Sequence, residues 1–76
     1  MTDFKVVNED RTYTMFLESS QVGQDTVEAR VIMYSTVYNI YKTKEDNTWH
    51  NHISKFELSP GLLKAVGAKL DEYLKL

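Results

Sequence analysis

The sequence predicts an α+β fold in which an antiparallel sheet of four to five strands is followed by one C-terminal helix. Several runs combine β-branched and aromatic residues with a period of two, which is typical of strands. Only the C-terminal segment has apolar residues at helical spacing behind a capping residue. We expect a single domain over residues 1–76, because a chain of 76 residues has the size of one small domain.

The longest strand-like run covers residues 27–41, and we place it at the centre of the sheet. Apolar residues occupy the odd positions of its first half and the even positions, Tyr38 and Ile40, of its second half. One flat strand cannot change parity in this way, because its side chains alternate strictly between two faces. Either a turn at Ser35-Thr36 divides the run into two strands, or a bulge redirects its second half.

Shorter runs supply the other elements. In chain order, we expect a hairpin of residues 3–8 and 12–18 around a polar turn, a loop over residues 19–25, a charged connection over residues 42–47 and a last strand over residues 48–58. The last strand changes parity near Ser54, which a bulge, a twist or the end of the strand would explain.

The C-terminal segment predicts the helix. Ser59 is a good N-cap because its hydroxyl accepts a hydrogen bond from the first turn, and Pro60 suits the first helical position. Gly67 either is tolerated, at about 1 kcal/mol relative to alanine, or allows close approach of the sheet or of a partner helix. The apolar stripe of the helix consists of Leu63, Val66, Gly67, Leu70, Tyr73 and Leu74.

Composition limits the possible classes of function. The chain has no cysteine, which excludes disulfides and cysteine-rich zinc sites and favours a cytoplasmic setting. It shows neither an apolar signal segment nor an apolar run long enough to span a membrane. There is no Gly-x-Ser-x-Gly motif and no glycine-rich phosphate loop, so we expect no enzyme, no catalytic residues and no cofactor.

The most ligand-like pair is His50 and His52, which share one face of the last predicted strand. A catalytic zinc site needs a third protein ligand, and the nearby acids are close only in sequence. We therefore expect two solvated histidines and no metal. The adjacent acids are also expected to be solvated; they are Glu9-Asp10, Glu45-Asp46 and Asp71-Glu72.

Both parities of the predicted strands carry large apolar side chains, yet one helix covers only one face of a sheet. Exposed apolar surface beyond a few hundred Å² usually marks an interaction site. The uncovered face is expected to meet a second subunit, to receive a ligand with flat apolar faces, or to curl over its own core. We favour a homodimer formed through the helix and a sheet edge, with Leu63, Gly67, Leu70 and Leu74 at the interface.

Cations and aromatic residues alternate over residues 30–55. Proteins hold single-stranded nucleic acid with rings that stack on bases, for about 1–3 kcal/mol per base, and with cations that follow the phosphates. The alternative is that these rings belong to the core and to cross-strand pairs. The candidate nucleic-acid-binding residues are Arg30, Tyr38, Tyr41, Lys42, Lys44, Trp49 and Lys55.

Three strings support this prediction: Tyr38-Asn39-Ile40-Tyr41, Phe56-Glu57-Leu58-Ser59-Pro60 and the opening Phe4-Lys5-Val6-Val7-Asn8-Glu9. In the transcriptional coactivator family called positive cofactor four, the first string is similar to a strand and the second to the end of the next strand with the entry to the C-terminal helix. The third is similar to the first strand of the short bacterial members of that family. The resemblance implies a curved four-stranded sheet with one helix, dimerisation through the helices and single-stranded DNA bound along the strands. The matching positions are Arg30, Tyr38, Tyr41, Lys42, Lys44 and Trp49.

Two hypotheses about function follow. The first is a non-catalytic, homodimeric single-stranded-DNA-binding protein that acts in transcription, replication or repair. The second is a small protein-interaction module, such as an inhibitor or regulator of a larger protein. The net charge of −2 favours the second hypothesis, and so do the many tyrosines, because Tyr and Trp are common at the centres of protein interfaces.

Overall fold

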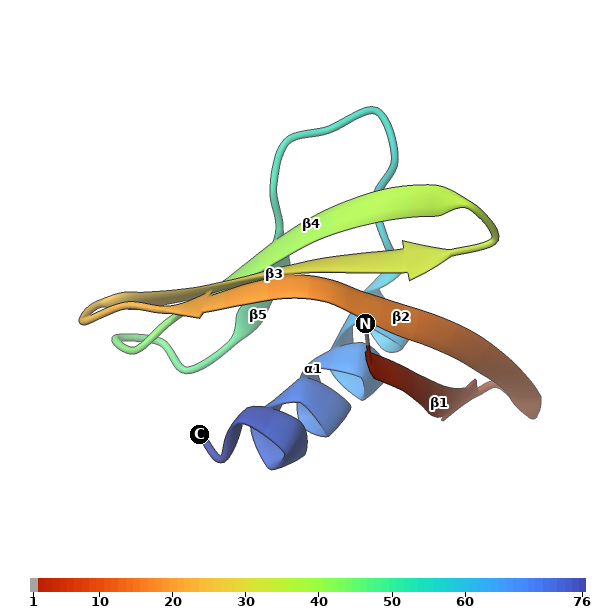
Figure 1. The fold of residues 1–76 in the computed structure, drawn as a ribbon, viewed down its shortest axis with the longest axis horizontal. Coiled ribbons are helices and arrows are strands. Elements are labelled where there is room, and N and C mark those ends of the chain that lie inside the picture. Colours follow the sequence, from red (N-terminus) through yellow and green to blue (C-terminus); the bar gives the residue numbers. More distant parts are fainter. Residues whose placement is uncertain (1) are drawn as a thin grey trace.

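The computed structural model describes residues 2–76 and confirms the α+β arrangement, with five antiparallel strands followed by one helix (Figure 1). The elements are β1 (Thr2–Asn8), β2 (Arg11–Val22), β3 (Thr26–Met33), β4 (Thr36–Thr43), β5 (Trp49–Asn51) and α1 (Pro60–Leu74). Each strand pairs with the next one along the chain. The helix lies on one face of the sheet, and its backbone comes closest to the edge strands β1 and β5, so the sheet curls around α1. No helix in this part of the chain is long and apolar enough to cross a membrane.

The central run is two strands, as one of the two sequence alternatives predicts. The turn lies one residue before the predicted Ser35-Thr36: Tyr34 and Ser35 join β3 to β4, and their φ angles are 52° and 63°. Two successive residues with positive φ make a two-residue turn whose twist matches that of the flanking strands. Met33 and Thr36 form the last pair before the turn, so each strand keeps its own parity.

The predicted loop over residues 19–25 is wrong in its first half. β2 continues to Val22, which pairs with Val27 of β3. A bulge between Leu17 and Ser19 shifts the register at this point. The polar end of β2 remains in the sheet because ladder hydrogen bonds come from the backbone and do not require apolar side chains.

The predicted last strand over residues 48–58 is also wrong in extent, because β5 ends at Asn51. After the strand ends, the Asn51 side chain forms two hydrogen bonds with the backbone of Leu58. Its Nδ2 donates to the carbonyl of Leu58 at 2.9 Å, and its Oδ1 accepts from the N–H of Leu58 at 3.0 Å. Residues 52–58 therefore form a loop that one side chain closes at its base. The loop rises on the side of the sheet away from α1 (Figure 1).

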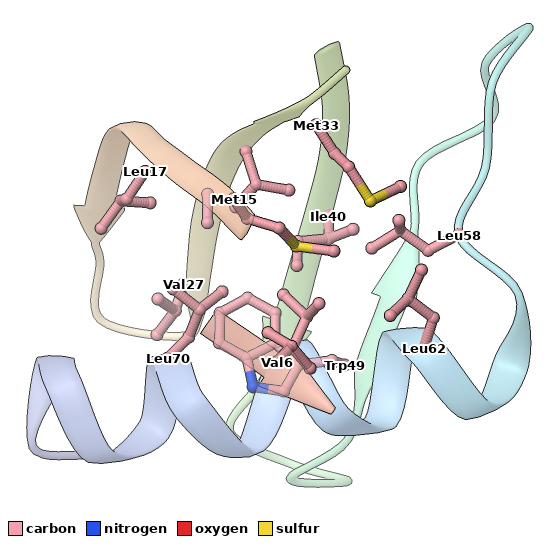
Figure 2. Close-up of a cluster of buried hydrophobic side chains, with 13 residues drawn as sticks. Val6, Met15, Leu17, Val27, Met33, Ile40, Trp49, Leu58, Leu62 and Leu70 are labelled. Atoms are coloured by element: carbon pink, nitrogen blue, oxygen red, sulfur yellow. The ribbon is translucent and has the colours of Figure 1, made fainter. Parts of the chain in front are cut away.

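The hydrophobic core fills the space between the sheet and α1, and Figure 2 shows its side chains converging from both layers. Its members are Val6, Met15, Leu17, Val27, Ala29, Val31, Met33, Ile40, Trp49, Leu58, Leu62, Val66 and Leu70. Phe4, Tyr13 and Tyr38 pack against this cluster while remaining partly exposed. These three rings are therefore partly used inside the protomer.

The helix begins as predicted, but its buried stripe is rotated. Ser59 Oγ accepts from the N–H of Leu62 at 3.4 Å, and Pro60 is the first helical residue. The buried residues are Leu62, Val66, Gly67 and Leu70, whereas Leu63 and Leu74 are half-buried and Tyr73 is exposed. Leu62, Val66 and Leu70 follow one another at intervals of four, and this row faces the sheet.

Gly67 allows the sheet to approach the helix closely. A Cβ built on Gly67 would lie 2.3 Å from Cδ1 and 2.8 Å from Cγ of Trp49. Real Cβ atoms do not approach other heavy atoms to such distances, so only glycine leaves room for the indole ring. Of the two sequence alternatives for Gly67, the structure selects close packing against the sheet.

Candidate functional site

The face of the sheet turned away from α1, which we call the open face, carries the candidate site. On β3, Val27 and Val31 are buried in the core, so strand alternation directs Glu28, Arg30 and Ile32 to the open face. Strand register extends this assignment across the sheet. The open face includes Lys5, Thr14, Phe16, Ser19, Gln21, Glu28, Arg30, Ile32, Val37, Asn39, Tyr41 and His50.

Strand register divides most of this face into three cross-strand rows. Starting from the β3–β4 turn, the first row holds Phe16, Ile32 and Val37; the second holds Ser19, Arg30 and Asn39; the third holds Gln21, Glu28, Tyr41 and His50. Directly opposed side chains in such a row have Cβ atoms about 5 Å apart. A ligand on the open face therefore meets an apolar row, a polar row and a row with an aromatic ring.

A polar hollow of about 280 Å³ lies over the second and third rows. Its lining residues are Ser19, Ser20, Gln21, Glu28, Ala29, Arg30, Asn39, Ile40 and His52. The side chains of Ala29 and Ile40 are buried in the core, so these two residues contribute backbone to the floor of the hollow. Its walls are made of hydroxyl, amide, carboxylate, guanidinium and imidazole groups.

Tyr41 lies beside this hollow and is held by two histidines. The centroid of its ring is 5.3 Å from that of His50 and 4.5 Å from that of His52. Each histidine contacts a carboxylate: His50 Nε2 lies 2.7 Å from Asp46 Oδ2, and His52 Nε2 lies 3.0 Å from Glu28 Oε1. The Tyr41 ring is thus positioned before any ligand arrives, which reduces the entropy lost on binding.

Asp46 organises the connection between β4 and β5. A hydrogen bond from the Thr43 side chain lowers the pKa of Asp46 to about 2, and hydrogen bonds from His50 and from the Thr48 backbone act in the same direction. Its Oδ1 accepts from Thr43 Oγ1 at 2.6 Å and from the Thr48 N–H at 3.0 Å. Asp46 is therefore exposed, as predicted, but it is bonded on several sides.

Two of the predicted nucleic-acid-binding residues, Lys42 and Trp49, are in the core and not on the open face. They are 5% and 7% exposed, respectively. Lys42 Nζ and Trp49 Nε1 donate to the same oxygen, Asp71 Oδ1, at 2.8 and 2.9 Å. The prediction that Asp71 is merely solvated is also wrong, because it is the acceptor for both buried donors.

The other candidate residues lie in different places. Arg30 is on the open face, with its Nε 3.7 Å from Glu18 Oε2. Tyr38 is on the helix side of β4 and packs partly against the core. Lys44 and Lys55 are exposed in the β4–β5 connection and in the 52–58 loop, and no ion pair within residues 3–76 includes them.

The four residues of the predicted dimer interface do not lie on one surface: two are buried and two are half-buried. Gly67 and Leu70 face the sheet of their own protomer and are buried, so they are not on a surface that a partner could reach. Leu63 and Leu74 are half-buried on the flanks of α1. Gly67 and Leu70 are unavailable because the stripe of α1 that contains them packs against the sheet, and Leu62 occupies the core position that the sequence pattern assigns to Leu63.

Among the residues that the structure describes, no three His, Asp or Glu side chains are grouped so that they could hold a metal ion. His50 and His52 instead contact separate carboxylates and share the ring of Tyr41.

Sequence reasoning missed Ser19, Gln21 and Asn39, which line the hollow. The sequence predicts a loop at Ser19 and Gln21 and gives no sign of the bulge that keeps β2 paired. Asn39 has the same parity as Tyr41 in β4, and this parity was the one available signal that both face the same side.

The chain was also compared with known proteins. No family model, curated protein or solved structure matches it. The resemblance to positive cofactor four therefore stays a prediction, and the function is argued from the geometry of the open face.

Proposed function

We propose that this protein is a non-catalytic, cytoplasmic, homodimeric binding protein that holds single-stranded nucleic acid on the open face and acts in transcription, replication or repair. The observation that supports this proposal is the juxtaposition of the Tyr41 ring, the Arg30 guanidinium and a hollow walled by hydrogen-bonding side chains. These are the groups that a strand with unstacked bases requires: a ring for stacking, a cation for phosphate and polar groups for base edges.

Single strands fit the open face better than a duplex does. The bases of a duplex are stacked inside it and show only their edges, whereas the bases of a single strand turn toward rings and polar groups on a sheet. The net charge of −2 does not oppose this, because a bound strand experiences the local field of the face it contacts. Arg30 lies on that face, and Lys44 and Lys55 extend from neighbouring connections without a carboxylate partner among residues 3–76.

The proposal predicts salt-dependent binding of a fluorescent single-stranded oligonucleotide, measured by anisotropy. Affinity should fall as salt rises, because contacts with phosphates release counterions. Tyr41→Ala should weaken binding by about 1–3 kcal/mol through loss of stacking. On an oligothymidylate, which has no guanine and leaves Arg30 to the phosphates, Arg30→Ala should reduce the slope of log affinity against log salt by about one.

Lys69→Ala is the matched control for Arg30→Ala, because Lys69 is an exposed cation on α1, on the other side of the sheet. This variant should bind like the wild type. A flat titration of the wild-type protein at low salt would reject nucleic-acid binding altogether.

The homodimer proposal moves to the outer flank of α1. A groove of about 500 Å³ lies there, lined by Asn47, Thr48, Trp49, Pro60, Leu63, Lys64, Ala68 and Asp71. Lys64 and Asp71 are equally spaced about the point between Gly67 and Ala68. An antiparallel helix from a second copy, crossing at that point, places Lys64 of each copy near Asp71 of the other. Ala68, which is small and exposed at this crossing, allows the helices to approach closely.

The dimer is tested by sedimentation velocity across a concentration series. We expect a dimer in the wild type and a shift toward monomer in Lys64→Glu, because this change puts like charges opposite each other in both copies. Lys69→Glu makes the same change of charge elsewhere on α1 and should leave the dimer intact. A wild-type protein that sediments at 8.9 kDa at all concentrations contradicts the proposed dimer.

A second candidate is a protein-interaction module, and the exposed apolar residues favour it. Tyr34 at the β3–β4 turn is 76% exposed, and in the 52–58 loop Phe56 is 50% exposed and Ile53 is fully exposed. If oligonucleotides fail to bind, a pull-down that recovers one stoichiometric protein with the wild type, but not with Ile53→Asp, selects this function.

A further inference from the structure

The polar hollow on the open face has hydrogen-bonding groups that the protein itself does not use. Asn39, Gln21 and Ser19 make no side-chain hydrogen bond within the described residues. Among the same residues, Glu28 uses only Oε1, which lies 3.0 Å from His52 Nε2, and its Oε2 has no partner. The hollow therefore presents both donors and acceptors to a ligand.

The size of the hollow suits one small ring system. Its volume of about 280 Å³ is below the usual range of about 300–1,000 Å³ for pockets that enclose drug-sized molecules. A single base of a bound strand is small enough to enter a hollow of this volume, while the rest of the strand remains on the open face beside it.

Glu28 and Arg30 give the hollow a chemical polarity. They are two residues apart on β3 and point to the same side, so their Cα atoms are roughly 7 Å apart along the strand. A carboxylate only accepts hydrogen bonds, and a guanidinium only donates them. The hollow thus offers a pair of acceptors next to a fork of donors.

Guanine is the base that matches this polarity. Its N7 and O6 are adjacent acceptors, which arginine recognises with two hydrogen bonds. The N1–H and the N2 amino group lie on the adjoining Watson–Crick edge, on the other side of O6, and are adjacent donors that suit a carboxylate. Adenine has a donor amino group where guanine has O6, cytosine presents one amino donor beside an acceptor, and thymine lacks an amino group.

We infer that the hollow holds one guanine base of the bound strand, with Arg30 at N7 and O6 and with Glu28 at N1 and N2. The inference rests on the proposed function, because it names the base that the same face selects. Asn39 and Gln21 border the base and supply further amide contacts.

The existing partners of Arg30 and Glu28 do not prevent this contact. Arg30 and Glu18 are 3.7 Å apart at their closest, beyond hydrogen-bond length, and both side chains are well exposed. Exposed ion pairs of this kind contribute little to stability, so Arg30 is able to exchange Glu18 for a base at small cost. Glu28 keeps His52 on Oε1 while Oε2 accepts from the base, and reorientation of its carboxylate supplies the second acceptor.

The test uses oligothymidylates of one length that differ at a single central position, measured by anisotropy at one salt concentration. The oligonucleotide with guanine should bind about tenfold more tightly than those with adenine, cytosine or thymine, as a bidentate contact of this kind discriminates. Replacing guanine by inosine removes only the N2 amino group, and replacing it by 7-deazaguanine removes only N7. Each replacement should abolish most of the preference.

Protein variants test the Arg30 contact with N7 and O6 separately from the Glu28 contact with N1 and N2. Glu28→Gln should lose sensitivity to the N2 amino group while keeping sensitivity to N7, and Arg30→Ala should show the reverse. Glu45→Gln, which neutralises a carboxylate in the β4–β5 connection, should keep the whole preference. The thermal melt of each variant confirms that it is folded.

Two outcomes overturn the inference, and they are distinguishable. If all oligonucleotides bind equally well, the guanine site is wrong while nucleic-acid binding stands. If none binds, the proposed function fails and the guanine site fails with it. The same series of oligonucleotides made as RNA shows whether the natural ligand is RNA or DNA, because the two series differ in the 2′-hydroxyl of the sugar.

Discussion

Replacing Asp71 with alanine is expected to lower the free energy of unfolding by about 3–5 kcal/mol, because it leaves a buried ammonium group without its counter-charge. Lys42 is 5% exposed, and its Nζ donates to Asp71 Oδ1 at 2.8 Å. The same oxygen accepts from Trp49 Nε1 at 2.9 Å, so a second buried donor loses its partner. Urea denaturation followed by circular dichroism measures the loss.

Lys42→Met is the informative comparison. Methionine fills a similar volume without a charge, and Asp71 keeps its bond to Trp49 and is partly open to water at 36% side-chain exposure. We expect a much smaller loss than in Asp71→Ala. The double variant should be more stable than Asp71→Ala alone, because no unpaired charge remains. If Asp71→Ala costs less than Lys42→Met, the Lys42 amine is not desolvated in the way its burial indicates.

Gly67→Ala should also destabilise the fold, although alanine is the better helix former by about 1 kcal/mol. The new Cβ would lie 2.3 Å from Cδ1 of Trp49, so the indole or the helix must move. Overpacking of a core in this way costs about 1–3 kcal/mol beyond the gain in propensity. The indole displacement should also change the fluorescence of Trp49, the sole tryptophan.

A pair of variants at Lys69 calibrates this result. Lys69 is exposed on α1 and lies outside the groove of the proposed dimer, so the difference between Lys69→Ala and Lys69→Gly measures helix propensity alone and should be about 1 kcal/mol. A Gly67→Ala variant that is more stable than the wild type would show that α1 and the Trp49 ring separate easily, contrary to their packing.

The sequence predicts the type and order of the elements well, because the physical signals are local. Strand alternation around Val27, the reversal before Thr36 and the cap at Ser59 each depend on neighbouring residues only. Boundaries at the polar end of β2 depend on pairing with β3, which no local pattern shows. Asn51 ends β5 through a side-chain contact seven residues away, which is equally invisible in the pattern.

The candidate site is harder to predict than the order of the elements. Strand parity shows which residues share a face of the sheet, but it does not show which of the two faces the helix covers. Lys42 has the same parity as Ile40, and this agreement was available as a sign of burial. Its charge argues the other way until the acceptor on α1 is known. Asp71 supplies that acceptor, and Gly67 makes the room that brings Trp49 to the same oxygen.

The two hydrogen bonds from the Asn51 side chain to the Leu58 backbone have a practical consequence for the 52–58 loop between these residues. Within the described residues, nothing from 53 to 57 forms a hydrogen bond or ion pair with the body of the protein. Asn51 and Leu58 fix the two ends of the loop, so its length is not set by contacts of the residues between them. Doubling the length of such a flexible segment costs only about 0.6 kcal/mol of loop-closure free energy. This segment is consequently the natural place to graft a peptide epitope or a dye-attachment cysteine, leaving sheet and helix as an undisturbed scaffold.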